Sequence, residues 1–113
     1  MTKEQFSMFM GAIKTYYPHT KVTNEMMKLW FYHLSDIPYQ TAAVALQKWA
    51  DKSQFAPSIA EIRKQVKDIL WMILEEKQGN EFLDVYAEIK KMEQHDKELP
   101  SQIKRIGEKN GDM

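Results

Sequence analysis

Apolar residues recur every three or four positions along most of this chain of 113 residues, and that spacing restricts the fold more than any other feature. The period gathers apolar side chains on one side of an α-helix, whereas a half-buried strand alternates apolar and polar residues. The first such stripe consists of Phe6, Phe9, Met10, Ile13, Tyr16 and Tyr17. We therefore expect a helix over residues 3–17, ended by Pro18, in an all-α fold with a single modest core.

Three more helices are predicted before residue 68. Thr23 can cap the second helix and either Ser35 or Asp36 the third, with Pro38 in the first turn of the third helix. In Ser58-Ile59-Ala60-Glu61 the serine hydroxyl and the glutamate carboxylate can each accept a free backbone N–H, which is the capping box of a fourth helix. The stripes of these helices contain Met26, Met27, Trp30 and Leu34, then Tyr39, Ala42, Ala43, Leu46, Trp49 and Ala50, then Ile62, Val66, Leu70 and Ile73.

The fourth helix should continue to about Gly79, and it is apolar on more than one side near its end. Asn80 can cap a fifth amphipathic helix that fades before Pro100. This fifth helix can fold back on the fourth helix of its own chain or pair with that of a second copy, and its periodicity allows both. The residues expected at a self-association surface are Trp71, Met72, Leu74, Phe82, Tyr86 and Ile89.

Beyond Pro100 the chain is polar, and we expect a flexible C-terminal tail over residues 100–113. The candidate partner-binding residues of this tail are Ile103, Lys104, Arg105 and Ile106. The predicted organisation is therefore a small four-helix N-terminal domain over residues 3–67, a long-helix extension over residues 68–99, and the tail.

The composition argues against a reaction centre. The chain has no Cys, which excludes thiol chemistry and zinc ribbons, and its four glycines form no phosphate-binding or dinucleotide pattern. His19, His33 and His95 are far apart in the sequence, without carboxylates at metal-binding spacing. We expect no catalytic, metal or cofactor site and a protein that is not an enzyme. The longest apolar run, residues 69–74, is far shorter than the roughly 18 residues of a membrane span, so we expect a cytoplasmic protein.

The charge is balanced overall but unevenly distributed. Residues 1–67 carry a net charge of +4 and residues 68–113 a net charge of −4. Lys21, Arg63, Lys64 and Lys67 could contact phosphate, so a weak direct DNA binder is one alternative, although no predicted helix has the outward Arg, Asn and Gln of a recognition helix. Apolar helical surface is the more prominent feature, and it favours a protein that acts by contact with other proteins, including a homodimer.

Two sequence blocks carry a resemblance to a known family. They are Trp30-Phe31-Tyr32-His33-Leu34-Ser35-Asp36-Ile37-Pro38-Tyr39 and Phe55-Ala56-Pro57-Ser58-Ile59-Ala60-Glu61-Ile62, with Ala42 and Ala45-Leu46 between them and Tyr17-Pro18 upstream. Over roughly residues 3–67 the chain resembles the N-terminal domain of bacteriophage replicative-helicase loader/inhibitor proteins. Most of these residues have predicted structural roles, as core (Trp30, Leu34, Leu46 and Ile62) or as helix caps (Asp36 and Ser58).

The resemblance implies a small helical accessory factor of phage-type DNA replication, acting in a bacterial host cell. It implies binding to the hexameric replicative helicase, restraint of that helicase, and help in delivering it to an origin-bound initiator protein. In that family the C-terminal segment contacts the helicase, which points to Ile103 and Ile106 in this chain. The alternative from the residues alone is a self-associating structural or regulatory protein of phage or prophage origin, built around Trp71.

Overall fold

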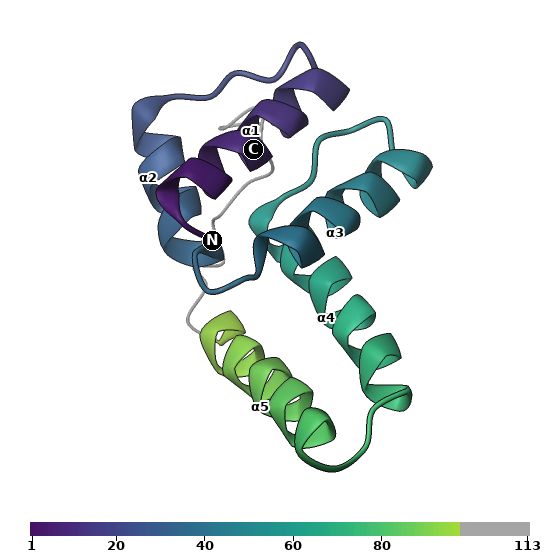
Figure 1. Ribbon diagram of the computed structural model, residues 1–113. Helices are drawn as coiled ribbons and strands as arrows, with labels where there is room; N and C mark the ends of the chain where they lie inside the picture. The colour runs from purple at the N-terminus through teal and green to yellow at the C-terminus, as the bar shows by residue number, and fades with distance from the viewer. Residues whose placement is uncertain (98–113) are drawn as a thin grey trace.

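The structure, a computed structural model, describes residues 1–97, and five α-helices account for most of them. In chain order they are α1 (Lys3–Tyr16), α2 (Asn24–Leu34), α3 (Tyr39–Lys52), α4 (Ile59–Glu75) and α5 (Gly79–Asp96). The described residues contain no strand, which confirms the predicted all-α fold. Figure 1 shows α1, α2 and α3 gathered at one end of the molecule, while α5 and most of α4 extend beyond them. No helix within residues 1–97 is long and apolar enough to cross a membrane.

Side-chain caps explain where three of the helices begin. Thr23 accepts a backbone N–H of the first turn of α2 at 3.1 Å, as predicted. In the predicted capping box of α4, the backbone N–H of Glu61 donates to the Ser58 hydroxyl at 3.1 Å, and that of Ser58 donates to the Glu61 carboxylate at 2.8 Å. A second capping box, between Thr2 and Gln5, starts α1 and is not among the predicted caps. Each such cap stabilises its helix by about 1 kcal/mol.

The start of α3 differs from the prediction. Its N-cap is Pro38, so neither Ser35 nor Asp36 caps this helix, and Pro38 precedes the first turn instead of lying in it. Ser35 still belongs to α2 as its C-cap, and Ile37 is fully buried in the connection that follows. The carboxylate of Asp36 binds Arg63 instead of a helix terminus. A tertiary partner has therefore overridden a local capping preference.

The turn between α4 and α5 also differs from the prediction. α4 ends at Glu75, short of Gly79, and α5 begins at Gly79 instead of after a cap at Asn80. The φ angle of Gly79 is +62°, a left-handed conformation that costs a residue with a Cβ atom roughly 1 kcal/mol. The glycine thus allows the chain to reverse direction between the two helices.

One hydrophobic core includes side chains from all five helices. The predicted core residues Trp30, Leu34, Leu46 and Ile62 are each no more than 2% exposed, and burying a side chain of this kind stabilises the fold by roughly 1.5–3 kcal/mol. The other members of the core are Phe6, Phe9, Met10, Ile13, Ile37, Ala42, Ala45, Ala56, Ile59, Val66, Leu70, Leu74, Ile89 and Met92.

α5 folds back on α4 of the same chain, which decides between the two arrangements that periodicity allowed (Figure 1). Ile89 and Met92 of α5 are almost completely buried, as are Leu70 and Leu74 of α4. Leu74 and Ile89 therefore lie inside the single chain, and the expectation that they form part of a self-association surface is corrected. Their apolar contacts hold the two helices together as an antiparallel hairpin.

Candidate interaction surface

A single buried cation fastens the base of the α4–α5 hairpin. The side chain of Arg63 is 1% exposed, and all five of its N–H groups donate hydrogen bonds. Its two Nη atoms donate to the carboxylate oxygens of Asp36 at 2.9 and 3.1 Å, and its Nε donates to Asp96 at 2.5 Å. The carbonyl oxygens of His33 and Met92 accept the other two bonds, at 2.7 and 3.1 Å. Arg63 thus joins α4 to the end of α2 and to α5.

The charges around Arg63 are balanced. Lys67 also donates to Asp96, so two cations face two carboxylates. Burial works to lower the pKa of Arg63, but its bonds to Asp36 and Asp96 raise that pKa above the ordinary value. Burial also works to raise the pKa of Asp36, yet the hydrogen bonds and charge of Arg63 bring it below the ordinary value. These groups therefore stay ionised at neutral pH and satisfy one another.

His33 and His95, which are far apart in the sequence, meet beside these ion pairs. Nδ1 of His33 lies 3.2 Å from Nε2 of His95, and Nδ1 of His95 lies 3.3 Å from a carboxylate oxygen of Asp36. Burial, followed by the positive charges of His95 and Arg63, lowers the pKa of His33. A neutral His33 ring fits this arrangement because two imidazolium rings at that distance would repel each other. Within residues 1–97, no group of three His or acidic side chains is placed to hold a metal ion.

The sequence contains a signal for this network that the helix prediction did not use. Arg63 falls on the apolar stripe of α4, four residues after Ile59 and three before Val66, and Asp96 follows Met92 on the buried stripe of α5. Charged side chains are rarely buried unless they are paired. A charge within an apolar stripe of each of two neighbouring helices therefore indicates a buried ion pair.

The burial of Arg63 also corrects its predicted phosphate contact. The guanidinium has no free N–H for a phosphate oxygen, so Arg63 is not part of a surface for DNA. Lys64 pairs with Asp68 at 3.4 Å, and Lys67 pairs with Asp96. The basic cluster expected near the start of α4 is largely neutralised by neighbouring carboxylates.

Three aromatic side chains of the hairpin remain partly exposed, and we call them the aromatic face: Trp71, Phe82 and Tyr86. Their exposed fractions are 41%, 39% and 39%. The rings of Phe82 and Tyr86 stack with their centroids 6.3 Å apart and their planes 8° from parallel. The ammonium group of Lys90 lies 5.3 Å from the centre of the Tyr86 ring. The predicted self-association residues on this face are therefore available to a partner.

The aromatic face combines residues of both helices at one level of the hairpin. The Arg63 network at the base and the salt bridge between Lys77 and Glu81 at the tip fix the register of α4 against α5. With the same rise per residue in both helices, the residue opposite Trp71 is about residue 87, next to Tyr86. The helical period places the face on the flank of the hairpin away from α2, because His95 occupies the other flank of α5.

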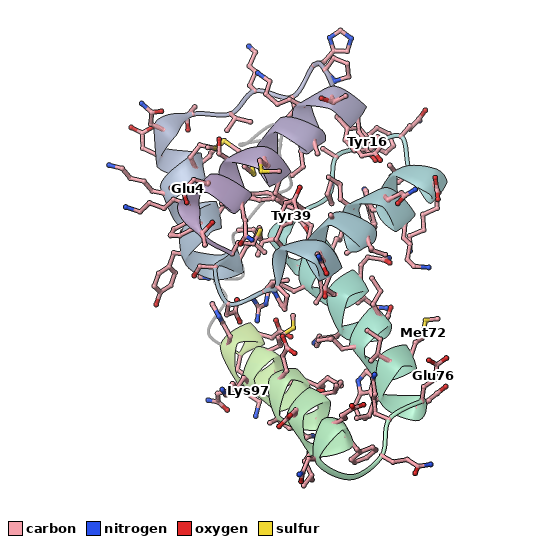
Figure 2. The ribbon with its side chains drawn as sticks, in the orientation of Figure 1. Glu4, Tyr16, Tyr39, Met72, Glu76 and Lys97 are labelled. Atoms are coloured by element: carbon pink, nitrogen blue, oxygen red, sulfur yellow. The ribbon has the colours of Figure 1, made fainter. Side chains whose placement is uncertain are left out.

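Other side chains at the tip differ from the aromatic face in direction or in charge. Met72 is 60% exposed but points away from α5 (Figure 2), so it lies apart from the aromatic face. Glu75, Glu76 and Asp84 are exposed, and none of them forms an ion pair within residues 1–97. Residues 71–87 carry a net charge of −3. The apolar surface of the tip therefore lies in an acidic environment.

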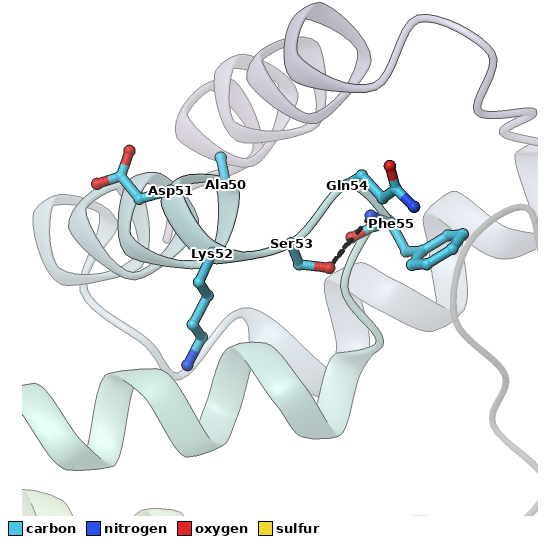
Figure 3. A pocket seen from close by; sticks show the side chains of 6 residues that line it. All are labelled: Ala50, Asp51, Lys52, Ser53, Gln54 and Phe55. Atoms are coloured by element: carbon cyan, nitrogen blue, oxygen red, sulfur yellow. Dashed lines mark hydrogen bonds between the residues drawn. The ribbon is translucent and has the colours of Figure 1, made fainter.

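A second exposed aromatic ring, Phe55, lies on the loop between α3 and α4 and is 60% exposed. The indole N–H of Trp49 donates to the Phe55 carbonyl at 2.7 Å, and the Ser53 hydroxyl bonds to the backbone of Phe55. The hydroxyl of Tyr17 donates to the Ser53 carbonyl at 2.9 Å. Figure 3 shows this loop beside a shallow, open depression of about 580 Å³, lined by residues 50–55. The loop presents the ring on a backbone that is held at several points.

The predicted tail residues Ile103, Lys104, Arg105 and Ile106 lie outside the described residues. The candidate surface that the structure describes is therefore the aromatic face with its acidic surroundings, held in place by the Arg63 network.

Comparison with known proteins identifies the family. A family model for the N-terminal domain of phage helicase-loader/inhibitor proteins matches residues 1–63, which comprise α1, α2, α3 and the start of α4. No curated protein and no solved structure matches the chain. The match covers more than half of the chain and contains the two sequence blocks that carried the resemblance. The chain belongs to this family of phage helicase-associated proteins.

Proposed function

We propose that this protein binds a replicative helicase and regulates its loading or restrains it, through protein contacts and without a reaction of its own. The observation that carries the proposal is the family match over residues 1–63. The hairpin surface supports it, because partly exposed aromatic side chains on a rigid support are typical of interaction sites. An origin-bound initiator protein is a further partner in this proposal.

The helicase contact has two candidate locations in this chain. One is the tail, with Ile103, Lys104, Arg105 and Ile106, which the family resemblance indicates. The other is the aromatic face, which lies beyond the part of the chain that matches the family model. Both follow the N-terminal helices in the sequence, so those helices act as the support for the contact region.

Capture of purified replicative helicase by the full chain and by a chain that ends at Leu99 tests this proposal. We expect the full chain to capture the helicase and the shortened chain to capture it at least tenfold more weakly. Equal capture by both chains would remove the tail from the contact, and no capture by either chain would refute helicase binding. DNA unwinding by the captured helicase, and its transfer to single-stranded DNA, then separate restraint from loading.

A second candidate function is self-association, and the exposure of the aromatic face favours it. Two copies could cover these rings by packing their hairpins together. Light scattering on the wild type and on Trp71→Glu tests this, with Met8→Glu as a control because Met8 is an exposed apolar residue of α1. A dimer in the wild type and in Met8→Glu, but not in Trp71→Glu, supports the candidate. A wild type that remains a monomer at all concentrations rules it out.

A further inference from the structure

The aromatic face and its surroundings specify what kind of segment would cover them. Trp71, Phe82 and Tyr86 are each about two-fifths exposed, so an occupant gains by placing apolar side chains against the rings. The nearby carboxylates of Glu75 and Glu76 have no ion-pair partner in the described part of the chain. An occupant with cations beside its apolar residues would therefore complement both the rings and the charge.

The chain itself contains a segment with this chemistry. Residues 101–109 include Ile103 and Ile106, with Lys104 and Arg105 between them, and the segment carries a net charge of +2. Two apolar side chains three residues apart can contact one surface together. The segment follows α5 directly in the sequence, so it is present at a high effective concentration near the hairpin.

The length of chain after α5 allows the segment to reach the aromatic face. From Asp96 back to Tyr86, α5 spans about 15 Å, and back to Phe82 it spans about 21 Å. Ile103 follows Asp96 by seven residues, which reach up to about 24 Å when extended, and Ile106 follows it by ten residues, which reach up to about 35 Å. A segment that turns back after α5 can therefore bring Ile103 to Tyr86 and Ile106 to Phe82.

We propose that residues 101–109 bind the aromatic face of their own chain and thereby withhold Ile103 and Ile106 from a partner. The cations of Lys104 and Arg105 then face the acidic side of the hairpin. The regulatory part of this proposal rests on the proposed function, in which the tail contacts the helicase. The helicase must then displace the tail from the hairpin before it can bind, which makes the chain self-inhibited.

The size of the expected effect follows from the fraction of chains with a free tail. If nine tenths of the tails are bound to the hairpin, the apparent affinity for the helicase is about tenfold weaker than that of a free tail. Loss of the docking site should therefore increase helicase affinity up to about tenfold in this case. We expect this gain for the variant Trp71→Ser/Tyr86→Ser, with Met8→Ser as a control on an exposed apolar residue of α1.

A spin label on the full chain tests the docking itself. The chain has no Cys, so Asn110→Cys provides a single attachment point for a nitroxide beside the segment. We expect this label to broaden the amide signals of Phe82 and Tyr86 and the indole signal of Trp71 in the NMR spectrum. A label at Met8→Cys is the control, and it should leave these signals unchanged.

Two further variants test the chemistry of the contact. Ile103→Ser/Ile106→Ser should abolish the broadening by the label at residue 110, whereas Gln102→Ser should preserve it. Glu75→Gln/Glu76→Gln should weaken the broadening, whereas Glu4→Gln, an exposed carboxylate of α1, should not. If the broadening persists unchanged in Ile103→Ser/Ile106→Ser, the assigned contact is wrong.

A mixed sample distinguishes the possible occupants. Spin-labelled chains without isotope are combined with isotope-labelled chains without a spin label. Broadening in this sample equal to that in the doubly labelled chain means that the tail of a second copy occupies the face, which overturns the proposal. No broadening of the aromatic face in either sample leaves the face free for another partner and also overturns it.

The measurement of helicase binding separates this proposal from the proposed function. Helicase capture without broadening refutes tail docking but retains the helicase contact. Broadening without helicase capture retains tail docking, refutes the helicase contact and removes the inhibitory role.

Discussion

Replacing Arg63 by Met removes the buried cation while keeping an unbranched side chain at that position. Asp36 and Asp96 then lose their main cationic partner, and two buried carbonyl oxygens lose their donor. Removing one partner of a buried ion pair costs roughly 3–5 kcal/mol. The carboxylate side chains are 33% and 21% exposed, so water can hydrate them in part, and we expect a loss of about 3 kcal/mol.

Urea unfolding followed by circular dichroism measures this loss, and a loss of that size corresponds to a melting temperature lower by about 12–24 °C. Lys64→Met is the control, because Lys64 is 75% exposed and pairs only with Asp68 on its own helix, so we expect a change below about 0.5 kcal/mol. A double-mutant cycle with Asp96→Asn should give a coupling free energy of about 1 kcal/mol or more. An Arg63→Met protein within about 1 kcal/mol of the wild type would show that the network does not fasten the hairpin.

Three further predictions concern pH, the hairpin turn and a helix cap. The depressed pKa of His33 means that the unfolded chain binds a proton more readily, so the free energy of unfolding should fall as the pH decreases below about 6.5. An unchanged pH slope in His33→Asn would contradict this. Gly79→Ala should destabilise the protein by about 1 kcal/mol because of its positive φ, whereas Gly11→Ala, in open space on α1, should stabilise it by up to about 1 kcal/mol in the same denaturation assay. Ser58→Ala should cost about 1 kcal/mol and Ser7→Ala, within α1, should not, and equal effects would refute the role of the capping box.

Periodicity and capping rules predicted the helices because both depend on residues that are close in the sequence. The capping box of Ser58 and Glu61 spans three residues, and nothing distant competes with it. Asp36 has the same local preference, but Arg63 offers its carboxylate two charge-assisted hydrogen bonds from a different helix. Only the packing of α2 against α4 creates that competition, so a rule based on neighbouring residues assigns Asp36 to the wrong partner.

The aromatic face shows a related limit. Periodicity identified Trp71, Phe82 and Tyr86 as apolar helix positions together with Leu74 and Ile89, and it could not separate the exposed residues from the buried ones. That separation depends on which side of each helix faces the other, and the Arg63 network and the hairpin turn fix this arrangement. The exposed fraction of an apolar side chain is therefore a property of the packed hairpin and not of its local sequence pattern.

The Arg63 network also bears on how the chain divides into parts. The family model ends at residue 63, within the continuous helix α4, yet the guanidinium at that position binds Asp96 and the Met92 carbonyl of α5. A chain cut soon after residue 63 would keep the Asp36 pair but lose both contacts to α5 and the cover that α5 gives to Leu70. The hairpin is consequently bound to the N-terminal helices by polar bonds and by a shared core. Movement of α5 would require breaking a buried charge network, so this hairpin is suited to presenting a fixed surface to a partner.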